Sequence, residues 1–148
     1  ITPVLSDSKL FRLAVKLLVE RHAGQAVDKI AAIDARGFLF GAAMAQKLKL
    51  GIVPIRKKGK LPYQTFDMSY DLEYGSATLS IHQDAFKPGE KVVLVDDLLA
   101  TGGTAAASAK LIEKAGGVVV GIDFLVELAF LKGREKLQGY DIFAPVVY

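Results

Sequence analysis

The stretch of sequence that decides the fold is Val92-Val93-Leu94-Val95-Asp96-Asp97-Leu98-Leu99-Ala100-Thr101-Gly102-Gly103-Thr104. Its apolar, β-branched beginning predicts a buried strand over residues 91–95, which ends at two aspartates. The glycine pair then predicts a turn, and a helix is expected from about Thr104 to Ala115, closed by Gly116 and Gly117. A strand, a turn and a helix in this order form one βα unit.

Strands and helices alternate along the rest of the chain as well. Short apolar runs predict further strands at residues 30–33, 52–55, 118–126 and 142–147, and helices are expected over residues 38–48 and 131–137. Alternating hydrophobicity over residues 72–81 predicts a hairpin or a pair of strands. The polar stretch that leads from the basic residues near position 60 to Tyr70 is expected to be a loop, although it is long for one.

A further helix is expected near the beginning of the chain. Ser6 and Asp7 are candidate N-caps, and the helix is expected to end near Gly24. Five apolar residues share one helical stripe: Leu10, Leu13, Ala14, Leu17 and Leu18. The stripe predicts a helix that packs on the surface of the core.

The order of these elements predicts an α/β fold with a mostly parallel central sheet flanked by helices on both faces. Continuous apolar strands, rather than strict alternation, are typical of parallel strands that are covered on both sides. A chain of 148 residues fits one domain, which is expected over residues 1–148. In open sheets of this kind ligands bind outside the carboxyl ends of the strands, which is where Asp96 and Asp97 are expected.

The composition excludes several classes of protein. Hydrophobic residues make up 51% and charged residues 24%, unlike a disordered chain. The apolar run over residues 118–125 is interrupted by Gly121 and Asp123 and falls short of the ~20 residues that span a bilayer. The net charge of +3 is modest and no basic recognition helix is present, so neither a nucleic acid nor a membrane is expected as a partner. The chain has no cysteine, which excludes thiolate metal sites and favours the cytoplasm.

The residues that follow the central strand suit a phosphorylated sugar. Carboxylates accept hydrogen bonds from a pair of sugar hydroxyls, so Asp96 and Asp97 suit a ribose diol. Residues 101–104 offer two hydroxyls, flexible glycines and the positive end of the following helix, which together suit a phosphomonoester. The alternative is an ordinary helix start, in which Asp97 or Thr101 is a cap and the glycines only form the turn.

The stretch over residues 92–104 resembles the signature that binds phosphoribosyl pyrophosphate (PRPP) in type I phosphoribosyltransferases. The form Asp-Asp-Leu-Leu-Ala-Thr-Gly-Gly-Thr is similar to the signature of the adenine phosphoribosyltransferases. Four further segments resemble motifs of the same family, in the same order: Ala35-Arg36-Gly37-Phe38-Leu39-Phe40-Gly41, Arg56-Lys57-Lys58-Gly59-Lys60-Leu61-Pro62, Tyr70-Asp71-Leu72-Glu73-Tyr74-Gly75 and Leu131-Lys132-Gly133-Arg134-Glu135-Lys136-Leu137. The resemblance therefore covers nearly the whole chain.

The resemblance implies a role for each motif. The expected PRPP-binding residues after the central strand are Asp96, Asp97, Ala100, Thr101, Gly102, Gly103 and Thr104. Arg36 is expected to bind pyrophosphate, for which a planar guanidinium is well matched, beside a non-proline cis peptide bond near Asp34 and Ala35. Without the resemblance, Arg36 is equally well explained as a solvated residue beside a helix cap.

The basic motif and the acidic motif carry weaker signals of their own. Arg56, Lys57 and Lys60 are implied to contact pyrophosphate, sometimes from the neighbouring subunit, and therefore to indicate a homodimer. Glu73 is implied to act as a general acid or base on the purine, and Tyr74 to cover the pyrophosphate, within a lid over residues 61–75. Read alone, a basic run and a lone glutamate are usually solvated. His22 and His82 are expected on the surface, without a catalytic role.

The implied reaction transfers ribose 5-phosphate from PRPP to adenine and gives AMP and pyrophosphate. Mg²⁺ is expected to be bound mainly by pyrophosphate and ribose oxygens, with no ligand from a protein side chain. The chain begins at Ile1 without methionine, and the resemblance implies an upstream segment that forms a hood over the base. Two alternatives remain open: transfer to another base, and a noncatalytic regulator that senses PRPP.

Overall fold

Strand β5 (Lys91–Leu99) lies at the centre of the sheet in the computed structural model, which describes residues 1–148. The eight-stranded sheet has the order β3-β4-β2-β1-β5-β6-β7, and β8 also pairs with β6. The other strands are β1 (Lys29–Ile33), β2 (Gly51–Lys57), β3 (Thr65–Asp71), β4 (Ser76–His82), β6 (Val118–Glu127), β7 (Ile142–Phe143) and β8 (Val146–Val147). Only the pairs that involve β4 are antiparallel, so the predicted, mostly parallel α/β fold is confirmed.

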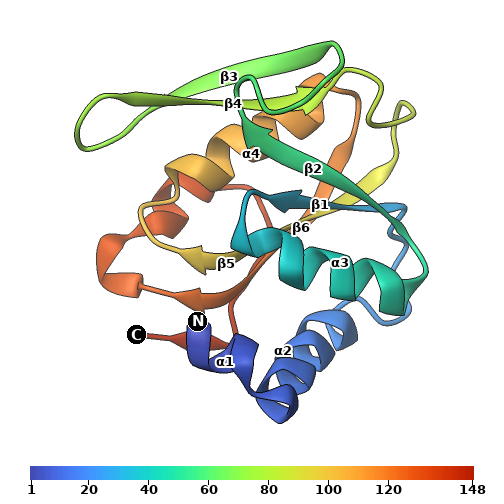
Figure 1. Ribbon diagram of the computed structural model, residues 1–148, viewed down its shortest axis with the longest axis vertical. Coiled ribbons are helices and arrows are strands. Elements are labelled where there is room, and N and C mark those ends of the chain that lie inside the picture. The colour runs from blue at the N-terminus through green and yellow to red at the C-terminus, as the bar shows by residue number, and fades with distance from the viewer.

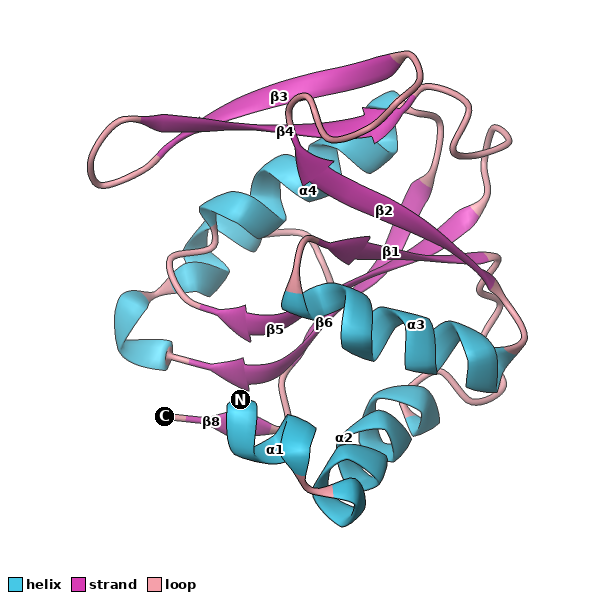
Figure 2. Cartoon of the chain, viewed as in Figure 1, coloured by secondary structure: helices cyan, strands magenta, loops and turns pink.

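Helices cover both faces of this sheet (Figures 1 and 2). The helices are α1 (Thr2–Ser6), α2 (Ser8–Glu20), α3 (Arg36–Leu48) and α4 (Gly103–Lys114), followed by two 3-10 turns, η1 (Ala129–Leu131) and η2 (Gly133–Leu137). Helix α4 packs on one face, and α2 and α3 pack on the other. None of these helices has the length and apolar character that a bilayer crossing requires.

The two faces bury two separate cores, and β5 belongs to both. Val92 and Leu94 contribute to the core beneath α4, whereas Val93 and Val95 contribute to the core beneath α2 and α3. All four side chains are fully buried, because successive residues of a strand point to opposite faces. The continuous apolar run of β5 is therefore explained by burial on two sides.

The beginning of α2 is as predicted, but its predicted apolar stripe is only partly buried. The Asp7 carboxylate caps the helix by accepting hydrogen bonds from the backbone amides of Lys9 and Leu10, at 2.8 and 3.0 Å. Leu18 and Ala14 are buried, whereas Leu10, Leu13 and Leu17 are exposed. The helix is rotated so that Val15, absent from the expected stripe, faces the core.

The prediction of a loop before Tyr70 is wrong. Residues 65–71 form β3, which pairs antiparallel with β4 and lies as a hairpin over α4 (Figure 1). Alternate residues Phe66, Met68 and Tyr70 pack against the core, while polar residues stand between them. A strand that buries only one face has few apolar residues, which is why the segment resembles a loop in sequence.

Three other boundaries differ from the expectation. Strand β5 continues past the two aspartates as far as Leu99, because Leu98 and Leu99 still pair with β6. The expected helix over residues 131–137 consists of 3-10 turns, and the expected last strand is divided into β7 and β8. The expected non-proline cis peptide bond is present between Asp34 and Ala35.

Candidate active site

A cavity of about 350 Å³ opens at the carboxyl ends of β1 and β5. It is lined by Ile33, Asp34, Ala35, Arg36, Lys57, Tyr70, Leu79, Asp96, Asp97 and Thr104. These residues come from five strands, the start of α3 and the start of α4. Six of them carry an ionisable side chain, and the position matches the crevice expected for an open α/β sheet.

The two aspartates of β5 have different surroundings. Asp97 is 4% exposed and forms an ion pair with Arg36. Asp96 accepts a hydrogen bond from the backbone amide of Asp97 at 2.8 Å. Burial raises the pKa of Asp96 well above its ordinary range, and the neighbouring Asp97 side chain raises it further, against the smaller lowering effect of the hydrogen bond from the Asp97 amide. The raised pKa favours a proton on Asp96.

The turn after β5 forms a second, smaller cavity of about 80 Å³ next to the first. It is lined by Asp96, Leu98, Leu99, Ala100, Thr101, Gly102, Thr104, Ala105 and Phe124. Gly102 immediately precedes α4 with φ +87°, a conformation that side-chain-bearing residues rarely adopt. No side chain caps α4, so its first amides are available to an anion.

A close contact between α3 and β5 brings Arg36 to the carboxylates. A Cβ atom on Gly37 would lie 2.9 Å from the Val95 carbonyl oxygen and 3.0 Å from Asp96 Oδ1. Only glycine allows this approach. Beside it, Arg56 Nε donates a hydrogen bond to Asp34 Oδ2 at 3.0 Å, which places Arg56 at the edge of the cavity.

Three of the expected residues are exposed and line neither cavity. Lys60 is exposed in the turn after β2, and Glu73 is exposed in the turn between β3 and β4. Tyr74, in the same turn, is 88% exposed. The structure therefore brings together Arg36, Lys57, both aspartates and the start of α4, but it does not bring Lys60, Glu73 or Tyr74 to them.

Sequence reasoning missed two residues of this cavity. Asp34 follows β1 directly and orients Arg56, a role that its place after a buried strand could have suggested. Tyr70 belongs to a quoted motif but is assigned no role by the sequence, and its hydroxyl accepts a hydrogen bond from Thr104 Oγ1 at 3.0 Å. Nothing in the sequence indicates that contact, because it depends on how the β3–β4 hairpin lies over α4.

The motif over residues 131–137 packs directly against the backbone of the turn after β5. A Cβ atom on Gly102 would lie 2.4 Å from the Gly133 carbonyl oxygen, and one on Gly133 would lie 2.5 Å from the Ala100 carbonyl oxygen. Arg134 binds the buried Glu127 carboxylate with three hydrogen bonds of 2.8 to 3.0 Å. This ion pair fixes η2 against the end of β6.

The expectation that His22 lies on the surface is wrong. His22 is 3% exposed, and its Nε2 atom lies 2.6 Å from Asp123 Oδ2. Arg21 Nε donates to the other oxygen of the same carboxylate at 2.8 Å. The fully buried Asp123 is thus paired with two residues that follow α2, and none of the three lines the cavity. His82 is half-buried.

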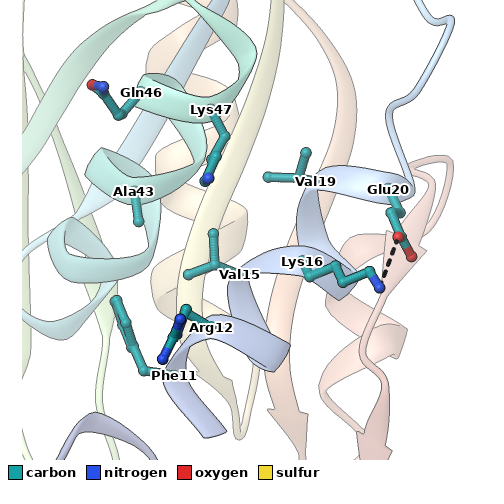
Figure 3. Close-up of a pocket in the computed structure, with 9 residues that line it drawn as sticks. All are labelled: Phe11, Arg12, Val15, Lys16, Val19, Glu20, Ala43, Gln46 and Lys47. Atoms are coloured by element: carbon teal, nitrogen blue, oxygen red, sulfur yellow. Dashed lines mark ion pairs between the residues drawn. The ribbon is translucent and has the colours of Figure 1, made fainter. Parts of the chain in front are cut away.

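A more voluminous pocket lies between α2 and α3 (Figure 3). Its volume is about 550 Å³, and its lining residues are Phe11, Arg12, Val15, Lys16, Val19, Glu20, Ala43, Gln46 and Lys47. Its wall is apolar, and the only ion pair in it joins Lys16 to Glu20 at 3.8 Å. It contains no paired carboxylates and no free helix start, so volume alone does not identify the site that carries the chemistry.

Comparison with known proteins agrees with this geometry. The model of the phosphoribosyl transferase domain matches residues 5–143. An adenine phosphoribosyltransferase of Christiangramia forsetii is 55% identical over 148 residues, which are 100% of this chain and 86% of that protein. The crystal structure of adenine phosphoribosyltransferase from Thermoanaerobacter pseudethanolicus superposes with a TM-score of 0.97 at 55% identity, over 100% of this chain and 86% of that one.

A third relative was crystallised with ligands. The adenine phosphoribosyltransferase of Saccharomyces cerevisiae, in complex with adenine and an imino-altritol bisphosphate, superposes with a TM-score of 0.89 at 40% identity. The match covers 97% of this chain and 83% of that one. The chain therefore belongs to the phosphoribosyltransferase family, among its adenine phosphoribosyltransferases.

Proposed function

We propose that this chain transfers ribose 5-phosphate from PRPP to adenine, with AMP and pyrophosphate as products. The observation that carries the proposal is the convergence of two aspartates, Arg36, Lys57 and the uncapped start of α4 on adjoining cavities. These groups suit the three parts of PRPP: a diol, a pyrophosphate and a phosphomonoester. The yeast relative that holds adenine and a bisphosphate supports the choice of base and sugar phosphate.

The 5′-phosphate is proposed to occupy the small cavity at the start of α4. The amides of residues 102–104 and the hydroxyls of Thr101 and Thr104 provide donors, and the helix dipole favours a negative charge there. Gly102 leaves room for backbone to approach the phosphate. The contact between Gly102 and Gly133 keeps this turn in place from the opposite side.

The ribose is proposed to lie over β5, with its hydroxyls donating to Asp97 and Asp96. The carbon–oxygen bond between the ribose and pyrophosphate breaks as the bond to the purine nitrogen forms. Positive charge develops on the ribose ring during this exchange, and a nearby carboxylate charge stabilises it. The proposed role of Asp97 uses its carboxylate, which forms an ion pair with Arg36.

The pyrophosphate is proposed to bind Arg36 and Lys57 at the mouth of the cavity. Arg36 is more than half exposed and reaches Asp97 across the cavity, so it can turn towards a phosphate without unfolding anything. Lys57 lies at the end of β2 and lines the same cavity. When Arg36 turns to the pyrophosphate, Asp97 becomes free to accept the ribose hydroxyls.

Magnesium is proposed to assist the leaving group. No group of three or more His, Cys, Asp or Glu side chains is placed to form a cage for a metal ion. The two aspartates are hard oxygen donors beside the pyrophosphate position, so the site fits a Mg²⁺ that is held mainly through substrate oxygens. When bound, the ion offsets the negative charge that builds up on the departing pyrophosphate.

Glu73 is proposed to reach the purine through closure of the β3–β4 turn. It receives the proton that the imidazole-ring nitrogen of adenine releases when the new bond forms, a role for which a carboxylate in a dry site is suited. Closure of the turn also places Tyr74 over the pyrophosphate and limits hydrolysis of PRPP. The position of Glu73, in the turn that joins β3 and β4 over α4, supports this proposal.

A homodimer is proposed as the active form, with Lys60 and Arg56 near the subunit boundary. Leu39 on α3 and Ile52 on β2 are large apolar side chains with 48% and 40% exposure on adjacent elements. An interface over this face would bury both of them. It would also bring the exposed turn that carries Lys60 close to a neighbouring subunit.

The experiment that tests the proposed function measures product formation from PRPP and Mg²⁺ with each purine offered in turn. Adenine is expected to be consumed with equal amounts of AMP and pyrophosphate formed, and hypoxanthine and guanine are expected to react at least ~10²-fold more slowly. Equal use of another base would assign a different transferase. PRPP binding without any turnover would favour a noncatalytic regulator.

A further inference from the structure

The one hydrogen bond between the β3–β4 hairpin and the start of α4 joins Tyr70 to Thr104. Thr104 Oγ1 donates to the Tyr70 hydroxyl oxygen at 3.0 Å. The Tyr70 ring also packs on the first turn of α4, because a Cβ atom on Gly103 would lie 3.4 Å from Tyr70 Cδ2. Both the ring and the hydroxyl of Tyr70 are therefore fixed relative to the helix start.

This hydrogen bond uses the hydrogen that a phosphate needs. A phosphate oxygen at the start of α4 can only accept, so Thr104 must donate to it. The same Thr104 hydroxyl lies 3.0 Å from the Tyr70 hydroxyl, to which it can donate. The Tyr70 hydroxyl has its own hydrogen, for which no protein acceptor is present, and Thr104 Oγ1 has lone pairs that can receive it.

We propose that Tyr70 is a positioning residue for the 5′-phosphate of PRPP and AMP, an inference that rests on the proposed function. When the phosphate binds, the hydrogen bond reverses: Tyr70 donates to Thr104 Oγ1, and Thr104 donates to the phosphate. Each donor polarises the next, so the chain of two hydrogen bonds strengthens the contact with the phosphate. Tyr70 acts through Thr104 and does not itself touch the reacting atoms.

The same residue connects the phosphate to the turn that carries Glu73. Tyr70 stands near the end of β3, three residues before Glu73, and lines the cavity together with Arg36 and Asp97. A hydroxyl held by Thr104 and the phosphate anchors the base of the hairpin on α4. The hairpin is therefore fixed more firmly when a 5′-phosphate is bound than when pyrophosphate alone is bound.

The test compares Tyr70→Phe, which removes only the hydroxyl, with Thr104→Val and with the double variant. Calorimetry with Mg²⁺ measures AMP and pyrophosphate affinity for each. Tyr70→Phe is expected to weaken AMP by about three- to tenfold, the loss of one neutral hydrogen bond, and to leave pyrophosphate unchanged. In the Thr104→Val background, Tyr70→Phe is expected to have no further effect, because the residue acts through Thr104. In steady-state assays KM for PRPP rises while kcat is little changed.

Tyr148→Phe is the matched control. Tyr148 is 73% exposed and lines neither cavity of the site, so its variant should bind AMP normally. Unchanged AMP affinity in Tyr70→Phe, with Thr104→Val impaired, overturns the role of Tyr70 and leaves the phosphate site intact. If the double variant loses AMP affinity by the product of the two single losses, Tyr70 acts independently of Thr104 and the proposed chain of two hydrogen bonds is overturned. Normal AMP affinity in Thr104→Val would show that Thr104 does not bind the 5′-phosphate. That result overturns the proposed phosphate site together with the inference.

Discussion

Two neighbouring aspartates of one strand have different surroundings. Asp97 forms an ion pair with Arg36. Asp96 forms no such ion pair, and burial beside a second carboxylate raises its pKa. The two side chains are therefore expected to respond differently to substitution.

Asp97→Asn is expected to weaken PRPP use while leaving the fold intact. The amide keeps the size of the side chain but loses the charge and presents an NH₂ group where a hydroxyl must donate. The expected rise in KM for PRPP, together with the fall in kcat, corresponds to at least ~10²-fold in kcat/KM. Steady-state kinetics at saturating adenine measure it. Normal PRPP kinetics in a folded variant would show that Asp97 does not bind the ribose hydroxyls.

Asp96→Asn is expected to stabilise the ligand-free protein at neutral pH. The folded pKa of Asp96 is raised, so the folded state binds more protons than the unfolded chain between the ordinary carboxyl pKa of about 4 and the folded value. Stability contributed by this group is therefore complete below pH ~4 and is lost as the pH rises through the folded pKa. The variant should therefore have a higher free energy of unfolding than the wild-type protein at pH 7.

Chemical denaturation of both proteins between pH 4 and pH 8 checks this. The two stability curves should converge towards pH 4 and separate as the pH rises. Parallel curves would mean that Asp96 is charged in the ligand-free protein. The gain in stability comes with a loss of PRPP turnover, as is common when a functional group is removed.

Glu73→Ala is expected to lower kcat by ~10²-fold or more with little change in PRPP affinity, because general acid–base groups contribute on that scale to the step and not to ground-state binding. Calorimetry gives the PRPP affinity and a turnover assay gives kcat. Glu135→Ala, which removes another exposed glutamate, is the control. A turnover number equal to that of the control would exclude Glu73 from the reaction.

At the scale of elements, the turn after β5 and the turn over residues 129–137 form one unit. Glycines on both sides let the two backbones touch, and the Arg134–Glu127 ion pair closes the contact. Loss of Arg134 would leave the buried Glu127 carboxylate without a cation, which is unfavourable. The motif near the end of the chain therefore supports the turn that is proposed to bind the phosphate.

Gly133→Ala is expected to displace the phosphate-binding turn. The new methyl group would lie 2.5 Å from the Ala100 carbonyl oxygen and 2.8 Å from Leu99 Cδ1, so the backbone must move. Overpacking of this kind costs about 1–3 kcal/mol, and we expect both a lower Tm and about tenfold weaker PRPP binding. Gly51→Ala, where a Cβ atom meets nothing within 4 Å, is the control. An unchanged PRPP affinity in Gly133→Ala would show that the turn over residues 129–137 does not hold the turn after β5 in its binding conformation.

Sequence reasoning succeeded for elements whose signal is local. Strand β5, the following glycines and α4 are contiguous, so burial, turn and helix start can be read from thirteen neighbouring residues. The same contiguity explains why the residues that follow β5 could be expected to lie together, while their roles towards phosphate and diol stay a prediction. The cis peptide bond at Asp34 was available only from resemblance, since no local pattern encodes it.

What escaped prediction depends on contacts between distant segments. Strand β3 buries Phe66, Met68 and Tyr70 only because it lies over α4. Likewise, His22 is buried only because Asp123, 101 positions away, offers a carboxylate beneath α2. Contacts of this kind follow from topology and register, which the local amino-acid pattern does not determine.

At the scale of the whole molecule, the position of Lys60 decides whether one subunit completes the site of another. Lys60 is exposed and lies outside the cavity of its own chain. Arg56, by contrast, pairs with Asp34 of the same chain and can act there. Arg56 and Lys60, both from the basic motif, are therefore expected to act on the sites of different subunits.

Mixing Lys60→Ala and Asp97→Asn subunits after mild dissociation tests this arrangement. If Lys60 acts on the neighbouring site, a hybrid dimer has one site with both defects and one with neither, so random mixing restores about a quarter of wild-type activity. If it acts within its own chain, every site keeps one defect and activity stays low. Sedimentation of each variant must first show two-chain particles, and restoration without them would contradict the dimer.

The membership of β5 in both cores also has a consequence for amide hydrogen exchange. Its backbone is paired with β1 and β6 on both edges, and its side chains are enclosed on both faces, so its amides can meet solvent only when the entire sheet comes apart. The hairpin of β3 and β4 is the outer edge of the sheet and can open alone. The aspartates proposed to hold the sugar thus stand on a strand whose amides are expected to exchange slowly, whereas Glu73 stands in an edge hairpin whose amides are expected to exchange faster. Under the proposed function, the ribose site would stay folded while the turn that carries Glu73 opens and closes.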